Sequence, residues 1–438
     1  MPDDLHGGKA LRFNPWLMPR EGSPLAELAA EVFAALPPPE ITPGRKHRAD
    51  AERRRMLSVT ALIANLASLY LMETGSLHYR GLSVPLKKTK QNRYNANPAG
   101  FTAQVLARSV SAMEASGHVS LLKGKKGRAI SEIALSESLR VKLAKAGISS
   151  ADIVIIPGGG ETIHLKHKPH GGTGRANARG ELIDYRETAQ TGAMREEMEA
   201  INEMLNAGSV CFDGQPVPPQ RLVRVFQVSG DDQKAQPEFN RHGRLYGGFW
   251  ESLEWSKRHL ITIGGEPIAD LDYCSLWLQM AYARQGAEMP HGDPYALPGL
   301  GCYRGAVKRT VASLFAKEGN LTAMRLPSAA KEELPEGWTM GRFIEAFSEK
   351  HNAVMPLLGR GLALEFMFLD SQMMVKILLD LRSQGITALP MHDGLMVGQS
   401  AKETAVTVMK NASMSLFGRA FEVAEKPLLS GFQCGSFK

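Results

Sequence analysis

The chain has 438 residues, of which 43% are hydrophobic and 22% charged, and its formal net charge is +7. This composition excludes a wholly disordered chain and leaves room for two or three domains with ordinary cores. No apolar run approaches the roughly 20 residues of a membrane span, the N-terminus does not resemble a secretory signal, and the four cysteines form no close pair. We therefore expect a cytoplasmic protein that does not contact a membrane.

Residues 1–44 are expected to form an N-terminal lead-in and linker. The stretch SPLAELAAEVFAAL combines a Ser-Pro helix start with an amphipathic pattern, which predicts one helix. The proline-rich PPPEITPG that follows breaks this helix and is typical of a linker.

Positive charge is concentrated in the next segment, residues 45–150. From Arg45 to Lys145 there are 19 Lys or Arg against 6 Asp or Glu. Two helices and a hairpin are predicted here, in the order found in winged-helix modules that bind nucleic acid. The residues expected to contact nucleic acid are Arg93 in a polar loop and Lys123, Lys125, Lys126 and Arg128 at the hairpin turn. The alternative is a lysine-rich solvated surface without a ligand.

Residues 151–207 are expected to contain a flexible hairpin followed by a connector helix. The hairpin is predicted around the histidine-bearing stretch TIHLKHKPHGG, and the helix covers the charged stretch YRETAQTGAMREEMEAINEMLNA. The helix is expected to pack through one face only.

The last 231 residues, 208–438, hold four short motifs. In chain order they are RHGRLYGGFW, EPIADLDYCSLWLQMAYA, YRGAVKRTVASLFAK and MHDG. Asp270 and Asp272 lie two apart in a predicted strand and therefore share a face. Arg304 and Lys308 lie four apart in a predicted helix and therefore project side by side. Asp393 lies in the predicted turn of a hairpin between two apolar runs.

Two carboxylates on neighbouring strands that face cations on a helix meet the needs of nucleotidyl transfer. Carboxylate oxygens can hold a pair of Mg²⁺ ions, and helix cations can stabilise a triphosphate. Each residue also has a simpler interpretation. Asp272 could cap a helix, Arg304 and Lys308 could form a solvated face, and His392 could be a turn residue.

At these motifs the sequence resembles family A DNA polymerases and the related single-subunit RNA polymerases of phages and mitochondria. The resemblance covers residues 240–400 and rests on Asp272-Tyr273, Arg304-x-x-x-Lys308, His392-Asp393 and the upstream Gly243-Arg244. It implies a polymerase palm sheet with small helical fingers, and use of two Mg²⁺ ions, with Mn²⁺ as the alternative.

The resemblance also implies roles for individual residues. Asp272, Asp393, Arg304 and Lys308 are expected to be catalytic, with Asp272, Asp393 and Tyr273 as metal ligands. The nucleotide is expected to contact Arg304, Lys308, Arg309, Trp277 and Phe315, and the template and primer to contact Arg244 and His392.

The sequence departs from the family at several positions. Trp277 stands where the DNA polymerases have a glutamate that blocks the ribose 2′-hydroxyl, and Gly394 replaces the usual acid after the His-Asp pair. Ala312, Ala316 and Lys317 occupy the positions of the aromatic and Tyr-Gly in the fingers helix, and Phe315 is the nearest ring. The choice between dNTP and NTP, and between primed and unprimed synthesis, stays open.

We therefore expect an α+β protein with a polymerase-like palm over residues 208–438 and a winged-helix-like region before it. The predicted function is template-directed nucleotidyl transfer, with a DNA or RNA template or primer and nucleoside triphosphates as partners. The alternatives are a non-catalytic DNA-binding replication initiator of a phage or plasmid, and a nuclease that uses the same two carboxylates.

Overall fold

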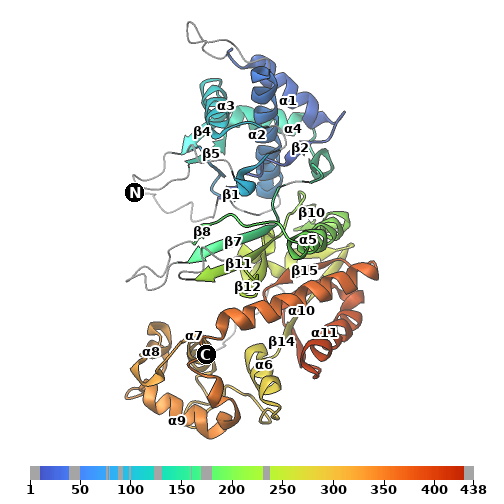
Figure 1. The fold of residues 1–438 in the computed structure, drawn as a ribbon. Helices are drawn as coiled ribbons and strands as arrows, with labels where there is room; N and C mark the ends of the chain where they lie inside the picture. The colour runs from blue at the N-terminus through green and yellow to red at the C-terminus, as the bar shows by residue number, and fades with distance from the viewer. Residues whose placement is uncertain are drawn as a thin grey trace. The chain divides into compact units, whose positions relative to one another are not determined.

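The structure, a computed structural model, describes residues 10–38, 50–74, 77, 79–86, 92–97, 100–122, 131–158, 160–168, 180–229 and 237–428. The fold is α+β, with helices and several small sheets (Figure 1). The chain divides into two compact units. The first comprises residues 1–161, 209–221 and 260–265, and the second comprises residues 162–208, 222–259 and 266–438. The borders between these units at residues 161 and 208 lie near the predicted boundaries at 150 and 207, whereas residues 1–44 belong to the first unit.

Helix α1 (Pro24–Ala35) belongs to the core of the first unit and is not a peripheral lead-in. Its N-cap, Ser23, accepts a hydrogen bond from the Ala26 backbone N–H, and Pro24 occupies the first helical position. Its apolar face, which includes Leu25 and Val32, is fully buried. The amphipathic pattern therefore predicted the helix correctly but not its place in the core.

Helix α2 (Ala51–Thr74) is the central helix of the first unit. By length and composition alone it is long and apolar enough to cross a membrane, which corrects the expectation that the chain has no such segment. Within the structure, 67% of its apolar window is buried. That burial is typical of a core helix, because α1 and α3 (Ala103–Ala115) pack against it.

The order helix, helix, hairpin expected in the first unit is present. Helices α2 and α3 precede the antiparallel strands β4 (Val119–Leu122) and β5 (Ser131–Leu135), and helix α4 (Glu137–Lys145) follows. The hairpin tip with its four predicted cations lies outside the described residues. The remaining strands here are β1 (Leu11–Arg12), β2 (Leu17–Pro19), β3 (Leu82–Val84), β6 (Ile153–Ile155), β9 (Val210–Phe212), β10 (Gln215–Pro216) and β13 (Ile261–Ile263).

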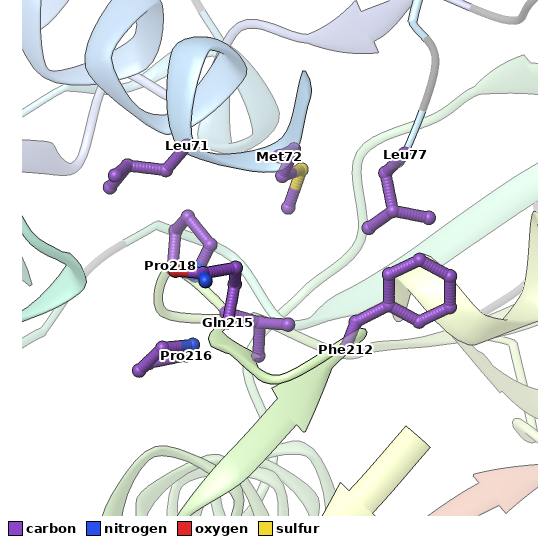
Figure 2. A pocket seen from close by; sticks show the side chains of 8 residues that line it. Leu71, Met72, Leu77, Phe212, Gln215, Pro216 and Pro218 are labelled. Atoms are coloured by element: carbon purple, nitrogen blue, oxygen red, sulfur yellow. The ribbon is translucent and has the colours of Figure 1, made fainter. Parts of the chain in front are cut away.

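A shallow apolar hollow lies between the end of α2 and the turn after β9 (Figure 2). Leu71 and Met72 line it from the helix, and Phe212 and Pro216 from the opposite side. Its empty volume is about 180 Å³. Part of this volume is open solvent, so the enclosed space is smaller still and cannot hold a nucleotide.

The second unit contains a four-stranded sheet in the order β12, β11, β7, β8. Strand β7 (Ile163–Lys168) runs parallel to β11 (Val223–Ser229) and antiparallel to β8 (Glu181–Leu182), and β12 (His242–Tyr246) is antiparallel to β11. Strands β7 and β8 are consecutive and antiparallel, as expected of the predicted hairpin, and β7 is in addition an inner strand of this sheet.

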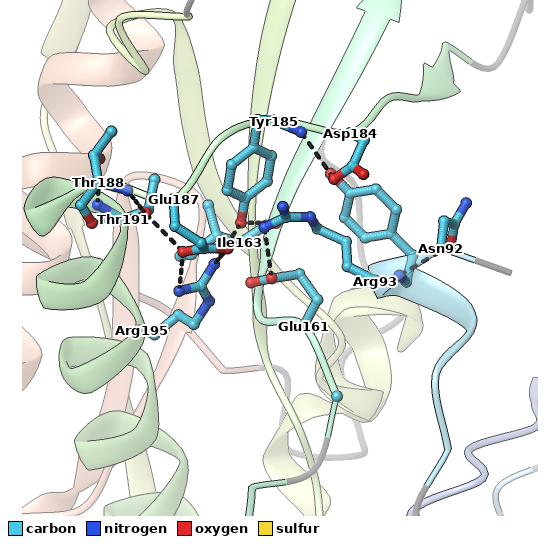
Figure 3. Close-up of polar contacts among 12 residues, drawn as sticks. Asn92, Arg93, Glu161, Ile163, Asp184, Tyr185, Glu187, Thr188, Thr191 and Arg195 are labelled. Carbon is cyan, nitrogen blue, oxygen red and sulfur yellow. Dashed lines mark hydrogen bonds and ion pairs between the residues drawn. The ribbon is translucent and has the colours of Figure 1, made fainter. Parts of the chain in front are cut away.

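Polar contacts join this sheet to helix α5 (Ala189–Ala207), the predicted connector (Figure 3). The Tyr185 hydroxyl donates to the Ile163 carbonyl at 3.1 Å, and Arg195 donates to the Tyr185 hydroxyl at 3.2 Å. Arg195 also donates two hydrogen bonds of 2.7 Å to the Glu187 carboxylate. Helix α5 also packs against α10 (Ala363–Ser383), so it is an integral part of the second unit.

A second, antiparallel sheet of this unit carries the predicted catalytic motifs. Strand β14 (Glu266–Tyr273) pairs with both β16 (Gly394–Gly398) and β17 (Val423–Lys426), and β15 (Ala388–Met391) pairs with β16. Helices α10 and α11 (Lys402–Phe417) pack against each other and against these strands. The apolar side chains of α10, which include Phe366, Ile377 and Leu378, account for its burial.

The 3-10 helix η4 (Phe249–Ser252) precedes β14, and a group of helices lies between β14 and α10 in the chain. The group includes α6 (Leu276–Gln285), α7 (Arg304–Ala316), α8 (Ser328–Glu333), α9 (Met340–His351) and the 3-10 helix η7 (Asn352–Leu357). Helix α7 packs against α8 and α10, and η7 packs against α6 and α9. This helical cluster occupies the place in the chain where small fingers were expected.

Candidate active site

The pairing of β14 with β16 brings the two predicted catalytic carboxylates together. Asp272, at the end of β14, is the register partner of Gly394 in β16. Asp393 directly precedes Gly394, at the tip of the hairpin between β15 and β16. Paired residues have Cα atoms about 5 Å apart and chain neighbours about 3.8 Å, so these two aspartates lie within about 9 Å at the Cα atoms.

Gly394, where the polymerase family has an acid, is required by the close approach of β14. A Cβ atom at this position would lie 2.4 Å from the Leu271 carbonyl oxygen and 2.7 Å from Asp272 Oδ1. Both distances are shorter than normal contacts between atoms. A side chain at position 394 would therefore displace the Asp272 carboxylate.

The negative charge of the Asp272 carboxylate is only partly neutralised by its surroundings. Its Oδ2 contacts Lys426 Nζ at 2.6 Å, whereas its Oδ1 is buried and has no hydrogen-bond partner among the described residues. Burial, and then the negative charge of Asp393, raise the pKa of Asp272 to about 6. The carboxylate thus has one unfilled oxygen and a second acid nearby, which is an environment that favours a bound cation.

Two residues with left-handed backbone geometry flank the carboxylates. His392 has a φ of 58° in the hairpin turn, and Ser275 has a φ of 49° just before α6. Left-handed residues other than glycine are uncommon and cost of order 1 kcal/mol or more each. The chain adopts them here because a two-residue turn and an abrupt strand-to-helix turn both need positive φ.

The two predicted cations of helix α7 lie on the side of the helix that faces the carboxylates. Lys308 is exposed and lowers the pKa of Asp272 through its charge, so it lies within electrostatic reach of this residue. Arg304 donates to Asp293 Oδ2 at 3.0 Å and stacks 5.1 Å from the centre of the Tyr295 ring. The i, i+4 spacing therefore placed these side chains correctly.

Arg309 does not join this pair of cations. Its guanidinium forms an ion pair with Glu333 on α8. One residue in a helix turns the side chain by about 100°, which directs Arg309 to α8 while Lys308 faces Asp272. The contact between Arg309 and the nucleotide stays a prediction, and the ion pair with Glu333 competes with it.

The aromatic residues predicted to contact the nucleotide differ in burial. Phe315 is 0% exposed and packs at 5.4 Å between ring centres against Phe366, so its predicted nucleotide contact is wrong. Trp277 is half-buried and packs edge-on against both rings. Its indole also lowers the pKa of Asp370 through a hydrogen bond. Trp277 therefore lies at the border between the core and the carboxylates.

Arg244 forms an ion pair with a buried acid on α10. Its guanidinium forms hydrogen bonds to both carboxylate oxygens of Asp370, at 3.2 Å from Nε to Oδ1 and 3.1 Å from Nε to Oδ2. Burial raises the pKa of Asp370 to about 7, and Arg244 opposes this rise. The charge of Asp393 also acts on Arg244. Arg244 thus lies within electrostatic reach of Asp393, and 14% of its side chain is exposed.

His392 lies beside Arg244 at the hairpin tip. Its exposed ring meets the Tyr246 ring edge-on at 6.2 Å. Partial desolvation, followed by the positive charge of Arg244, lowers the pKa of His392. A neutral, exposed imidazole at this place can contact a nucleic-acid strand without adding charge.

Tyr273 cannot serve as a metal ligand through its hydroxyl. The hydroxyl donates to the Met409 carbonyl at 2.6 Å, and the side chain is 3% exposed. Only its backbone carbonyl remains for such a role. Within the described ranges, no cluster of three or more His, Cys, Asp or Glu side chains could hold a metal ion.

Two carboxylates nevertheless fit Mg²⁺, which usually takes one or two acids and completes its shell with water and phosphate oxygens. The unpartnered Oδ1 of Asp272 supports this fit.

In the first unit, Arg93 is the only predicted nucleic-acid contact among the residues that the structure describes. It lies in the short helix η1 (Arg93–Asn95), and its guanidinium lies 3.4 Å from Glu161 Oε2. Lys123, Lys125, Lys126 and Arg128 lie outside those residues.

Sequence reasoning missed two residues of the site. Lys426 contacts Asp272, and Arg258 forms a buried ion pair of 2.8 Å with Asp270. No local motif marks either residue, since Lys426 reaches the site only through the pairing of β17 with β14. A comparison with protein-family models and a comparison with curated proteins both found no match.

Proposed function

We propose that this protein is a template-directed nucleotidyltransferase with an active site centred on Asp272 and Asp393. The observation that carries the proposal is the register of β14 and β16, which places the two acids at one end of a strand pair. Lys308 and Arg304 approach the same end from helix α7. This combination supports transfer of a charged phosphoryl group more directly than a single capped or turn aspartate would.

The proposed reaction divides among four side chains. Asp272 and Asp393 hold divalent cations, and Lys308 stabilises the negative charge that develops on the triphosphate in the transition state. Arg304, with 56% of its side chain exposed, binds the phosphates by exchanging its ion pair with Asp293. Two bound Mg²⁺ ions would supply charge neutralisation and a lowered pKa for the attacking hydroxyl.

The test is extension of a labelled primer on a template, with dNTPs and NTPs assayed separately in Mg²⁺. Asp272→Asn and Asp393→Asn should each abolish product, because each removes a carboxylate oxygen that holds a cation. Asp380→Asn, which changes an exposed aspartate on α10 that pairs with Lys376, is the matched control and should retain wild-type synthesis. Unimpaired synthesis by either active-site variant would refute the assignment.

The same assay separates the other functions. Degradation of the labelled strand that depends on Asp272 and Asp393 would identify a nuclease. DNA binding that weakens with salt, without incorporation of either nucleotide set, would identify a replication initiator. Omission of the primer tests whether synthesis begins without one.

A Lys308→Gln variant tests the role of helix α7. The loss of one electrostatic donor should lower kcat by about 10²–10³-fold. The expected loss is in kcat and not in primer binding, because Lys308 is assigned to the triphosphate. A variant with wild-type kcat would remove Lys308 from the proposed mechanism.

A further inference from the structure

Lys426 partly neutralises the Asp272 carboxylate through its Oδ2, next to Oδ1, which has no partner among the described residues. In the register of β17 and β14, Lys426 lies directly opposite Asp270. The Asp270 carboxylate is already engaged by Arg258 at 2.8 Å, so Lys426 Nζ reaches diagonally to Asp272 Oδ2 at 2.6 Å. The lysine therefore neutralises Asp272, whereas Arg258 neutralises Asp270 on the same face of the strand.

The backbone that delivers Lys426 is anchored. The Cys274 N–H donates to the Glu422 carbonyl at 2.9 Å, and the Glu422 N–H donates to Gln279 Oε1 at 2.9 Å. Phe421 is 1% exposed and packs against the Tyr273 ring. The start of β17 is thus fixed to the turn that follows Asp272.

The Lys426 side chain, in contrast, is partly exposed to solvent. It is 41% exposed, and its ammonium is a single charge on a flexible stem with three rotatable donors. Arg258, the partner of Asp270, is a planar guanidinium that is 10% exposed. A lysine can leave its carboxylate for water, whereas a buried arginine cannot do so without leaving a buried charge behind.

We propose that Lys426 is a displaceable counter-ion of the metal site, which occupies Asp272 until a divalent cation replaces it. This inference rests on the metal site of the proposed function. The ammonium and a divalent cation compete for the same carboxylate, and they also repel each other at this distance. Lys426 therefore raises the divalent-cation concentration at which the site fills.

The experiment measures Mn²⁺ binding to the full chain by electron paramagnetic resonance at pH 8, without nucleotide or nucleic acid. Lys426→Gln should bind Mn²⁺ with a Kd about fivefold or more below that of the wild type. Lys426→Arg keeps the charge and should bind no more tightly than the wild type. Asp272→Asn should lose this binding. The matched control is Lys402→Gln, because Lys402 pairs with Glu425 on the same strand at 2.6 Å, and its Kd should not change.

An unchanged or raised Kd in Lys426→Gln would overturn the inference, and so would the absence of Mn²⁺ binding in every variant. Primer extension by the wild type, run in parallel, keeps this result separate from the proposed function. If Mn²⁺ binding depends on Lys426 but the wild type does not extend the primer, the proposed polymerase function is rejected and the counter-ion role of Lys426 is retained. If the wild type extends the primer but the Kd for Mn²⁺ is the same in Lys426→Gln, only the counter-ion role of Lys426 is rejected.

Discussion

Asp270 and Asp272 lie two residues apart on one face of strand β14, yet their surroundings differ in almost every respect. The side chain of Asp270 is 3% exposed and forms an ion pair with Arg258, which also donates to Met391 Sδ at 2.9 Å. Asp272 is 17% exposed, keeps one unpartnered oxygen and faces a second acid. Asp270 is therefore buried with a fixed counter-ion, Arg258. Asp272 has an oxygen to which a further cation can bind.

The difference shows how one strand can combine stability with reactivity. A buried acid paired with a guanidinium is costly to disrupt, because loss of either partner leaves an uncompensated buried charge. An acid whose ionised form is disfavoured by burial and by a like charge gains most when a cation binds. The partner, more than the position on the strand, decides which role an aspartate takes.

The largest expected effect is on stability at Asp270. Asp270→Asn should lower the free energy of unfolding by about 3–5 kcal/mol, because it leaves the Arg258 guanidinium buried without its counter-charge. Asp272→Asn should leave this free energy unchanged or raise it, because it removes a disfavoured carboxylate. Urea unfolding of both variants in a chelating buffer measures the two effects. An equal decrease in the free energy of unfolding of the two variants would contradict the proposed difference between Asp270 and Asp272.

The next effect concerns the contact between β14 and β16. Gly394→Ala should destabilise the protein by about 1–3 kcal/mol, since its Cβ would overlap the Leu271 carbonyl and Asp272 Oδ1. The same substitution should also abolish incorporation by displacing the carboxylate. Gly192→Ala in α5, where a Cβ meets no atom within 4 Å, is the control. It should leave incorporation at the wild-type level.

A smaller effect is expected in the pH dependence of stability. The pKa of Asp272 is about 6 in the folded chain against 3.8 for the free group, so the folded state binds this proton more tightly. Stability from this group is therefore present at low pH and is lost as the pH rises from about 4 to about 6. Compared with Asp272→Asn, the wild type should lose stability over this window in metal-free urea unfolding. A difference that is independent of pH would contradict the raised pKa.

The smallest effect should come from Arg309. Arg309→Gln breaks an ion pair whose side chains are 43% and 52% exposed, so the loss of stability should stay below about 1 kcal/mol. Incorporation should stay close to the wild-type rate, in contrast to Lys308→Gln one residue away. A large loss of incorporation in Arg309→Gln would instead indicate that Arg309 contacts the nucleotide.

Local periodicity accounts for what could be predicted from the sequence. The helical spacing of Arg304 and Lys308, the alternation in β14 and the His-Asp turn all involve residues within a few positions of one another. Each motif consequently lies on the expected type of element, and the two acids come together as expected. Asp370 on α10 is buried and pairs with Arg244, whereas Glu365 on the same helix is 44% exposed and pairs with Arg284.

Long-range pairing accounts for what could not be predicted. Strand β17 joins β14 from about 150 residues further along the chain, and β7 joins β11 across about 60 residues. Neither pairing leaves a local signal, so the role of Lys426 and the place of residues 163–168 were missed. Burial of Phe315 likewise depends on rings from α6 and α10 that the sequence of α7 does not specify.

The left-handed turns at His392 and Ser275 have a consequence for the dynamics of the second unit. The elements that they connect, β15 and β16 at His392 and β14 and α6 at Ser275, hold both turns in the left-handed conformation. The backbone strain is therefore released where the packing of these elements loosens. Amide protons around these two turns should therefore exchange faster than those in the middle of β14 and β16. A ligand that bridges the two acids would clamp both turns at once and slow that exchange.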